Sequence, residues 1–440
     1  AHAPYTDASL IRAIAAGTNI NDQPMSPLMP RYALADGDLG PLVAYLKQLS
    51  NTLSPGVTDS SVRFATIIAP GVDATRRDLM LRMIRDAFRQ RNFSQSPRSG
   101  QMRTPLESIP HQRRNWELAV WELTGAPDTW AAQLTEYYAR EPAFAVVSGL
   151  SNGTWTPVHR FCEEQRLPCL FPSVDLPGDT ESFYSLYFSR GVALEAAVLA
   201  KHLREAKKPP RRVVQVHRDD PVANAAAAAL AGALATSGIT LEDRIFDPAQ
   251  PKAAGRDLGT ADVAAVLWLR TADLAALAKT SPKPPAAALY LSARMAGDDL
   301  KAYPQTWRPG VQLIYPYAIG EEREKNVRTL KGWLQTYGLP LVDESFQSEV
   351  FFNLLLLTDV TTQILDNYYR DYFVERTEDM LGQFVDRAQS AQSMLGQGAN
   401  VSAYPRLSLG AGQRFASKGA YIARFDKHGT LVAQTDWIVP

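Results

Sequence analysis

The sequence predicts an α/β protein built from two doubly wound lobes, each with a mainly parallel sheet. Short apolar strands alternate with helices along most of the chain, which is the pattern of parallel sheets covered by helices on both faces. A complete strand–helix–strand unit occupies residues 142–177, and the same alternation starts again near residue 183. The restart indicates a second lobe of the same kind.

The strand–helix–strand unit begins with the apolar run Phe144–Val147 and ends with a second apolar run, Leu167–Phe171. Between them, Ser148–Thr154 supplies turn and helix-cap chemistry, and a helix is predicted from Pro157 to about Gln165. Because the carboxyl ends of parallel strands form the ligand crevice of open α/β sheets, the turns after these strands are candidate binding residues. The alternative is that the first turn only caps the helix.

The remaining elements follow from apolar periodicity. Before this unit, the first lobe is predicted to contain a buried strand, an amphipathic helix, a strand and a helix, at Val62–Ala69, Arg76–Arg91, Trp116–Trp121 and Thr129–Arg140. From residue 183 onward, strands are predicted at Tyr184–Phe188, Arg212–Val216, Ala261–Leu269, Ala286–Leu291 and Leu313–Ile319, with helices at Gly191–Leu203 and Val222–Ser237. Helices dominate from Glu321 to about Ser393, and a β-hairpin closes the chain with Gly419–Phe425 and Leu431–Trp437.

The composition argues against several classes of protein. Lysine plus arginine equals aspartate plus glutamate at 46 residues each, so no net charge steers the chain toward nucleic acid or anionic lipid. No apolar run approaches the roughly 20 residues that a membrane-spanning helix needs. Nucleophile elbows, phosphate-binding loops and metal-ligand clusters do not occur in the sequence. We therefore expect no enzyme, no cofactor and no metal site.

Two cysteines, Cys162 and Cys169, lie in the strand–helix–strand unit. We expect them to form a disulfide, which for so short a loop would stabilise the fold by roughly 2–3 kcal/mol. The alternative is a pair of buried thiols. A zinc site is not expected, because six intervening residues fit no usual ligand pair and only His159 is near in sequence.

Residues 1–52 are expected to form a separate unit, followed by a linker at 53–61. Ala8–Ala16 and Gly40–Ser50 have helical patterns, and a proline-rich loop separates them. This loop and the helix after it resemble the carboxyl-terminal half of a class I c-type cytochrome, which implies Met29 as the axial methionine. The sequence has no Cys-x-x-Cys-His, so covalent haem attachment is excluded in this chain. We interpret the segment as a cytochrome remnant; the alternative is a helical hairpin that packs on the main body.

Three local patterns of the main body occur in the order of a known family: AVVSGLSNG followed by PVHRFCEEQRLPCLFPS, then RRVVQVHRDDPVANAAAAALAGAL, and finally AYIARFDKHGTLVAQTDWIV. With them, residues 60–440 resemble the type I periplasmic binding proteins of the branched-chain amino-acid group, the substrate-binding subunits of ABC importers. The resemblance implies two lobes, 62–185 with 320–395 and 186–319 with 396–440. It also implies hinge closure on a small ligand in the cleft between them, a membrane permease as partner and a periplasmic location.

Candidate ligand-binding residues lie where the predicted strands end. The first lobe offers Ser148, Gly149, Leu150, Ser151, Asn152, Ser173 and Asp175, with Trp155 as a pocket floor or as core. Their hydroxyls and backbone amides suit a carboxylate, helped by the positive end of the following helix. The second lobe offers Asp219, Arg270, Thr271, Arg294 and Tyr317.

The predicted charge of the ligand rests on two arginines. Arg270 and Arg294 end neighbouring strands of the second lobe, and a guanidinium binds a carboxylate through two parallel hydrogen bonds. They favour an organic acid, with an aromatic group a further option near Trp155 or Tyr317. The alternative is that each arginine forms a surface or interlobe salt bridge. Asp175 and Asp219 would also allow a ligand with an amine.

Two classes of function remain. The first is capture of a small solute, carrying a carboxylate, for an ABC importer. The second is a sensing or redox-associated periplasmic protein in which a cytochrome module is fused to the binding fold. An adjacent permease gene would favour the first class, and a haem-binding motif upstream would favour the second.

Overall fold

The computed structural model describes residues 5–26, 34–48, 53–94, 113–178, 182–254, 263–281, 288–297, 305–390, 402–410 and 412–440. The chain forms two compact units, Ala1–Leu53 and Ser54–Pro440, and each is described by itself.

The first unit contains two helices, α1 (Asp7–Ala16) and α2 (Asp36–Gln48). A capping box between Thr6 and Ser9 starts α1, because each side chain binds the other's backbone amide. Both predicted helices are present, and α2 begins four residues earlier than its apolar pattern indicates. The proposed axial residue Met29 lies outside the described residues.

The first sheet of Ser54–Pro440 is parallel in all its described pairings. Its strand order is β6-β4-β1-β3-β5-β7, and β2 also pairs with β1. The strands are β1 (Ser61–Ile68), β2 (Asn115–Glu122), β3 (Ala145–Val147), β4 (Leu150–Thr154), β5 (Cys169–Leu170), β6 (Ser173–Leu176) and β7 (Ser185–Leu186).

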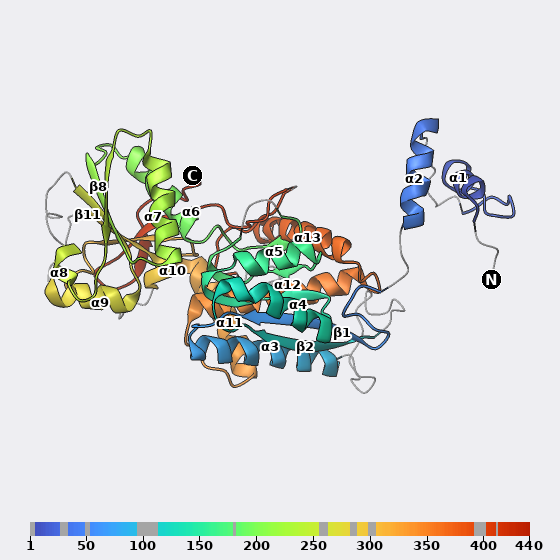
Figure 1. Ribbon diagram of the computed structural model, residues 1–440, viewed down its shortest axis with the longest axis horizontal. Helices are drawn as coiled ribbons and strands as arrows, with labels where there is room; N and C mark the ends of the chain where they lie inside the picture. Colours follow the sequence, from blue (N-terminus) through green and yellow to red (C-terminus); the bar gives the residue numbers. More distant parts are fainter. Residues whose placement is uncertain are drawn as a thin grey trace. The chain divides into compact units, whose positions relative to one another are not determined.

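Helices cover both faces of this sheet (Figure 1). Phe64 and Ile68 of β1 share a core cluster with residues of α3 (Ala74–Ser94) and α12 (Glu344–Ile364). The alternate residues Ala65 and Ile67 pack instead with α4 (Trp130–Arg140) and α5 (Thr156–Glu164), next to the 3₁₀ turn η1 (Pro127–Thr129). A strand that is buried on both faces explains why the run has apolar residues at successive positions.

The second sheet has the order β14-β13-β12-β11-β10-β8-β9. Strands β8 to β12 pair in parallel, and the hairpin β13–β14 adds two antiparallel strands. The strands are β8 (Arg212–His217), β9 (Thr240–Ile245), β10 (Val263–Trp268), β11 (Ala288–Ser292), β12 (Val311–Tyr315), β13 (Tyr421–Phe425) and β14 (Leu431–Ala433).

Helices also cover both faces of the second sheet. One core cluster joins its strands to α6 (Val192–Arg204) and α7 (Pro221–Leu234), and the opposite strand residues pack with α8 (Pro251–Ala254) and α9 (Thr271–Thr280). The other helices are α10 (Ala293–Ala296), α11 (Gly320–Thr336) and α13 (Arg370–Ser390). The predicted α/β fold with two doubly wound lobes is confirmed.

Two local predictions were wrong. Ser151–Thr154, expected as a turn and helix cap, forms strand β4 and pairs with β6. The first residue of α5 is Thr156, and its N-cap residue Trp155 makes no side-chain capping hydrogen bond. Strand β9 was not predicted, because it is a half-exposed strand with polar residues at four of six positions, TLEDRI.

Strands β3 and β5 each continue, after a break, as β4 and β6. At the breaks, Ser148 and Phe171 adopt left-handed backbone conformations, with φ of 59° and 48°. Such conformations cost a non-glycine residue free energy and persist only where the surroundings hold them. Asn353 of α12 holds both breaks, because its amide donates to Ser148 Oγ and to the Leu170 carbonyl, each at 3.0 Å.

The two cysteines are free and buried in the structure rather than joined by the predicted disulfide. Cys162 lies in α5 and Cys169 in β5, and both belong to the apolar cluster on this face of the sheet. Burial and a side-chain hydrogen bond with Cys169 raise the pKa of the Cys162 thiol. The alternative, a pair of buried thiols, is what the structure contains.

We therefore expect two titratable thiols per chain when protein purified without reductant is denatured and mixed with a thiol reagent. The folded protein should react far more slowly, because both thiols are buried and a thiol reacts as its thiolate. Absence of thiol signal after denaturation would show that the pair is oxidised after all.

Candidate functional site

A cleft of about 810 Å³ lies at the carboxyl ends of strands from both sheets. Its volume falls in the roughly 300–1,000 Å³ range of small-molecule sites. Its walls come from β4 and β6, from the segments that follow β10, β11 and β12, and from the start of α12. Strand ends of this kind are where open α/β sheets bind ligands.

Four residues predicted in the first lobe line the cleft: Ser151, Asn152, Ser173 and Asp175. The Ser173 hydroxyl donates to Glu349 Oε2 at 2.6 Å. The Asn152 amide donates to the Gly71 carbonyl at 3.3 Å. The breaks before β4 and β6 bring these polar residues to the cleft, since each break redirects a buried strand.

Four residues predicted from the same stretch do not line the cleft: Ser148, Gly149, Leu150 and Trp155. The Ser148 hydroxyl is buried and accepts from Asn353. Trp155 is completely buried under the strand break, where a Cβ at Gly149 would lie 2.9 Å from its ring. In this structure these residues lie behind the cleft wall and do not line the cleft.

In the second lobe, Arg270, Thr271, Arg294 and Tyr317 line the cleft as predicted, and Asp219 does not. The cleft residues follow β10, β11 and β12, which are adjacent strands. Asp219 follows β8, one strand nearer the sheet edge, where its carboxylate accepts from the Asn224 side chain at 2.9 Å. Its position in the strand order explains why it lies outside the cleft.

Arg270 spans the cleft from the start of α9. Its Nη2 donates to Asp175 Oδ2 at 2.8 Å and to the Asn152 carbonyl at 3.2 Å. The side chain keeps 37% of its surface exposed. Among the described residues its Nη1 and Nε make no hydrogen bond, so these donors remain for a ligand.

Arg294 is different, because its side chain is only 7% exposed and is surrounded by acceptors. Nη2 donates to the Val174 carbonyl and Nη1 to the Tyr404 hydroxyl, each at 2.9 Å. Carboxylate oxygens of Asp175 and Glu349 lie 3.7 Å and 3.6 Å away. Burial alone would lower the pKa of Arg294, but the tyrosines and these carboxylates raise it well above the usual value. Arg294 thus forms the interlobe salt bridge that was the alternative prediction.

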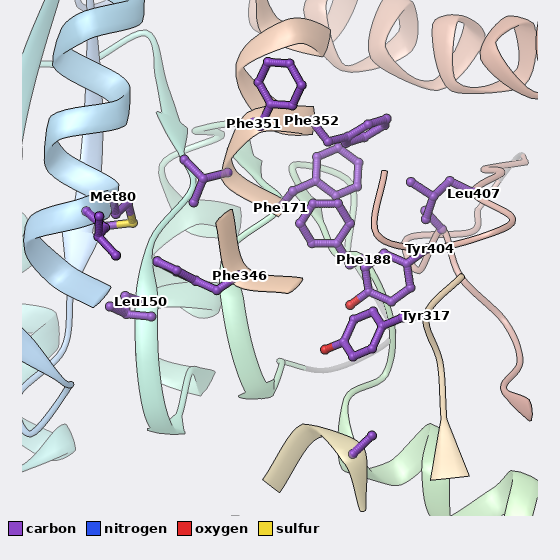
Figure 2. Close-up of a cluster of buried hydrophobic side chains, with 14 of the residues drawn as sticks. Met80, Leu150, Phe171, Phe188, Tyr317, Phe346, Phe351, Phe352, Tyr404 and Leu407 are labelled. Atoms are coloured by element: carbon purple, nitrogen blue, oxygen red, sulfur yellow. The ribbon is translucent and has the colours of Figure 1, made fainter. Parts of the chain in front are cut away.

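An aromatic column connects the core to this arginine. Figure 2 shows the rings of Phe171, Phe188, Tyr404 and Tyr317 in succession, with the two hydroxyl groups at its lower end. Phe188 and Tyr404 are stacked with ring centroids 5.3 Å apart. Burial and the neighbouring Glu349 raise the pKa of Tyr404 well above its usual value, so its hydroxyl stays a donor. The column fixes the tyrosine hydroxyls that hold Arg294.

Sequence reasoning missed the contribution of α12 and its partners. Asp343 and Glu344 line the cleft and pair with Arg76 of α3 and Arg323 of α11, at 2.5 Å in both cases. Glu349 accepts from the Tyr404 hydroxyl at 2.7 Å. These partners come from distant parts of the sequence, and the acidic start of α12 was the only local signal.

The cleft is almost balanced in charge. Its described lining contains four arginines, namely Arg76, Arg270, Arg294 and Arg323, and five carboxylates, namely Asp73, Asp175, Asp343, Glu344 and Glu349. The lining thus carries one more negative than positive charge. The predicted preference for an anion does not follow from this net charge, and depends on the remaining donors of Arg270.

A buried acid supports the cleft wall from behind. Glu195 of α6 has no exposed surface and accepts from the Ser292 hydroxyl and, at 3.1 Å, from the Arg294 backbone amide. Burial raises the pKa of Glu195 to about 8, although Ser292 and Arg294 oppose the shift. The carboxyl group thus holds the short helix α10, which lines the cleft along its whole length.

Two negative findings apply to the described residues. No helix there is both long enough and apolar enough to span a bilayer. Those residues also contain no group of three or more histidine, cysteine, aspartate or glutamate side chains that could hold a metal ion.

No family model and no curated protein matches the chain. Solved structures match it over most of its length. A branched-chain amino acid ABC transporter protein from Thermus thermophilus with bound valine has a TM-score of 0.62 at 12% identity, and the match covers 87% of this chain and 97% of that one. The chain has the fold of type I periplasmic binding proteins.

Two further structures agree with this fold. A fatty acid ABC transporter substrate-binding protein from Thermomonospora curvata has a TM-score of 0.59 at 14% identity, over 88% of this chain and 95% of that chain. A branched-chain amino acid transporter substrate-binding protein from Streptococcus pneumoniae in complex with isoleucine has a TM-score of 0.57 at 11% identity, over 87% and 100%. The cytochrome resemblance of residues 1–52 gains no support from these comparisons.

Proposed function

We propose that Ser54–Pro440 is a solute-binding protein that captures a small organic molecule with a carboxylate group in the cleft. The lobes close around the solute by a hinge motion and deliver it to the permease of an ABC importer. The location is the periplasm, where such a protein meets its permease. The lobe boundaries predicted above, 62–185 with 320–395 and 186–319 with 396–440, are part of this proposal.

The observation that carries the proposal is the cleft itself. Polar side chains from the strand ends of two sheets meet around a cleft of about 810 Å³, in a fold shared with proteins named as substrate-binding proteins of transporters. Pockets with a few convergent polar groups are the usual binding sites of α/β folds.

The remaining donors of Arg270 support a carboxylate as the recognised group. A carboxylate that binds a guanidinium through two parallel hydrogen bonds uses Nη2 together with either Nε or Nη1, so on Arg270 it would share or replace the Asp175 contact of Nη2. Thr271 lies beside Arg270 in the cleft lining. Valine, isoleucine and fatty acids, which the matched proteins bind or are named for, all carry this group. No observation on residues 5–26 or 34–48 favours the redox-associated alternative, so we do not propose it.

Native mass spectrometry of the purified protein, followed by thermal-shift screening with organic acids and amino acids, tests the function. We expect one class of carboxylate solute to raise the melting temperature, because a ligand that binds only the folded state stabilises it. Matched amides or alcohols of the same carbon skeleton should give no shift. A screen in which no carboxylate stabilises the protein would contradict the proposal.

A further inference from the structure

We propose that Asp175 is an internal substitute for the ligand carboxylate. In the ligand-free protein it occupies the guanidinium donors of the second lobe, and a ligand carboxylate takes its place on Arg270. The inference rests on the proposed function for the ligand, and its first test needs no ligand.

The contacts of Asp175 are those of a bound anion rather than of a structural carboxylate. Among the described residues its side chain accepts a hydrogen bond only from Arg270, at 2.8 Å, and its second oxygen lies 3.7 Å from Arg294 Nε. Both partners belong to the second lobe, whereas Asp175 lies in β6 of the first. The Asp175 side chain is only 14% exposed, so the free-energy cost of removing its carboxylate from water is offset mainly by groups across the cleft.

The other paired carboxylates of the cleft each have at least one partner within the first lobe, whereas both arginine partners of Asp175 lie in the second. Asp343 caps α12 by accepting from the Phe346 amide at 3.2 Å, besides its pair with Arg76. Glu349 accepts from Ser173 and Tyr404. Asp175 is thus the acid whose removal leaves the hydrogen bonds of its own lobe intact.

The two arginines have different roles. Arg294 is buried and also bound to the Tyr404 hydroxyl of the second lobe, so it keeps a partner when the lobes separate, whereas its bond to the Val174 carbonyl crosses the cleft and is lost on opening. Arg270 is more exposed and, within the described part of the chain, hydrogen-bonds to the first lobe only through Asp175 and the Asn152 carbonyl. A ligand carboxylate that binds Arg270 therefore competes with Asp175 for the same guanidinium. Because Asp175 is already paired with it, the positive charge of Arg270 is not unpaired before the ligand binds.

The lobe separation of the ligand-free protein tests this idea. Thr75→Cys and Lys427→Cys place dyes at exposed positions near opposite sides of the cleft, and the native thiols are buried and do not compete. Single-molecule energy transfer is compared for the wild-type background, Asp175→Asn and the matched control Asp219→Asn. Asp219 is exposed and lies outside the cleft.

We expect mostly high energy-transfer efficiency, which corresponds to closed lobes, in the wild-type background and in Asp219→Asn. In Asp175→Asn we expect mostly low efficiency, which corresponds to open lobes. Adding Arg270→Ala to Asp175→Asn should produce little further change, because the ion pair between the two residues is already lost and Arg270→Ala removes in addition only the hydrogen bond to the Asn152 carbonyl. Sodium acetate should restore high transfer in Asp175→Asn, and sodium chloride at equal ionic strength should not.

Unchanged transfer in Asp175→Asn would overturn the proposal, and so would restoration by both salts or by neither. Failure of the proposed function is distinguishable from these outcomes. It would appear as a solute screen without a carboxylate hit while Asp175→Asn still opens the lobes.

Discussion

Replacing Arg370 by alanine is expected to lower the free energy of unfolding of Ser54–Pro440 by about 4 kcal/mol. The Arg370 side chain is buried at the start of α13 and donates to five backbone carbonyls and one hydroxyl. Its acceptors are the carbonyls of Pro55, Ala143, Phe144, Gln165 and Arg166 and the hydroxyl of Tyr138. Alanine would leave the buried carbonyls of Ala143 and Phe144 without this donor, and the loss of a donor to a buried acceptor is costly.

Urea unfolding followed by circular dichroism measures this change. Arg376→Ala is the matched control, because Arg376 lies on the same helix but pairs with the exposed Asp379 at 2.9 Å. The control should cost less than about 1 kcal/mol, as surface ion pairs do. Equal losses in the two variants would mean that the buried network around Arg370 does not stabilise the fold as described.

A second large effect is expected in the pH dependence of stability. Glu195 has a pKa of about 8 in the folded protein, above its ordinary value of 4.5, because it is buried. Between these two pH values the folded state holds a proton that the unfolded state has lost. The stability that this group contributes is therefore complete below the lower pH value and disappears as pH rises through the upper one, with a total on the order of 5 kcal/mol.

Glu195→Gln removes this titration while keeping an amide oxygen for the Arg294 backbone amide. Urea unfolding of both proteins at a series of pH values should show the variant gaining stability relative to wild type as the solution becomes alkaline. The charged groups nearest to Glu195, Arg294 and Asp175, are present in both proteins, so their contributions cancel. Parallel pH profiles would show that Glu195 does not carry the raised pKa.

The fold was predictable from the sequence because its signals are local. The apolar run of β1 and the helix signals around Pro157 needed no long-range information, and the alternation of strands and helices then defined the fold class. The position of Arg270 and Arg294 at the ends of β10 and β11 also followed from the pattern, and these strands are paired neighbours. Strand β9 carries no such apolar signal and was missed.

The cleft was only partly predictable because its geometry depends on distant contacts. Glu349 meets Ser173 across 176 positions of the sequence, and no local pattern records that distance. The strand breaks at Ser148 and Phe171 were not predicted, and neither was the outcome that Trp155 is core while Ser151 lines the cleft. Asp219 looked equivalent to Arg270 until the strand order placed β8 beyond β10.

The structure also gives Arg270 and Arg294 different roles. From sequence they were equivalent clamps for an anion, whereas in the structure Arg294 is buried among its own partners and Arg270 keeps donors for a ligand. A ligand carboxylate should therefore depend more on Arg270 than on Arg294. The aromatic column ending at Tyr317 remains available to an aromatic ligand, while Trp155 does not.

Isothermal titration calorimetry of wild type, Arg270→Ala and Asp219→Ala, with the carboxylate solute found by the screen, tests the central claim most directly. We predict that Arg270→Ala weakens binding by about 10- to 100-fold, the loss expected for one charge-assisted hydrogen-bond pair in a partly exposed site. Asp219→Ala should bind as wild type does, because Asp219 lies outside the cleft. Unchanged affinity in Arg270→Ala would contradict the account, since the cleft would then hold its ligand without the arginine assigned to its carboxylate.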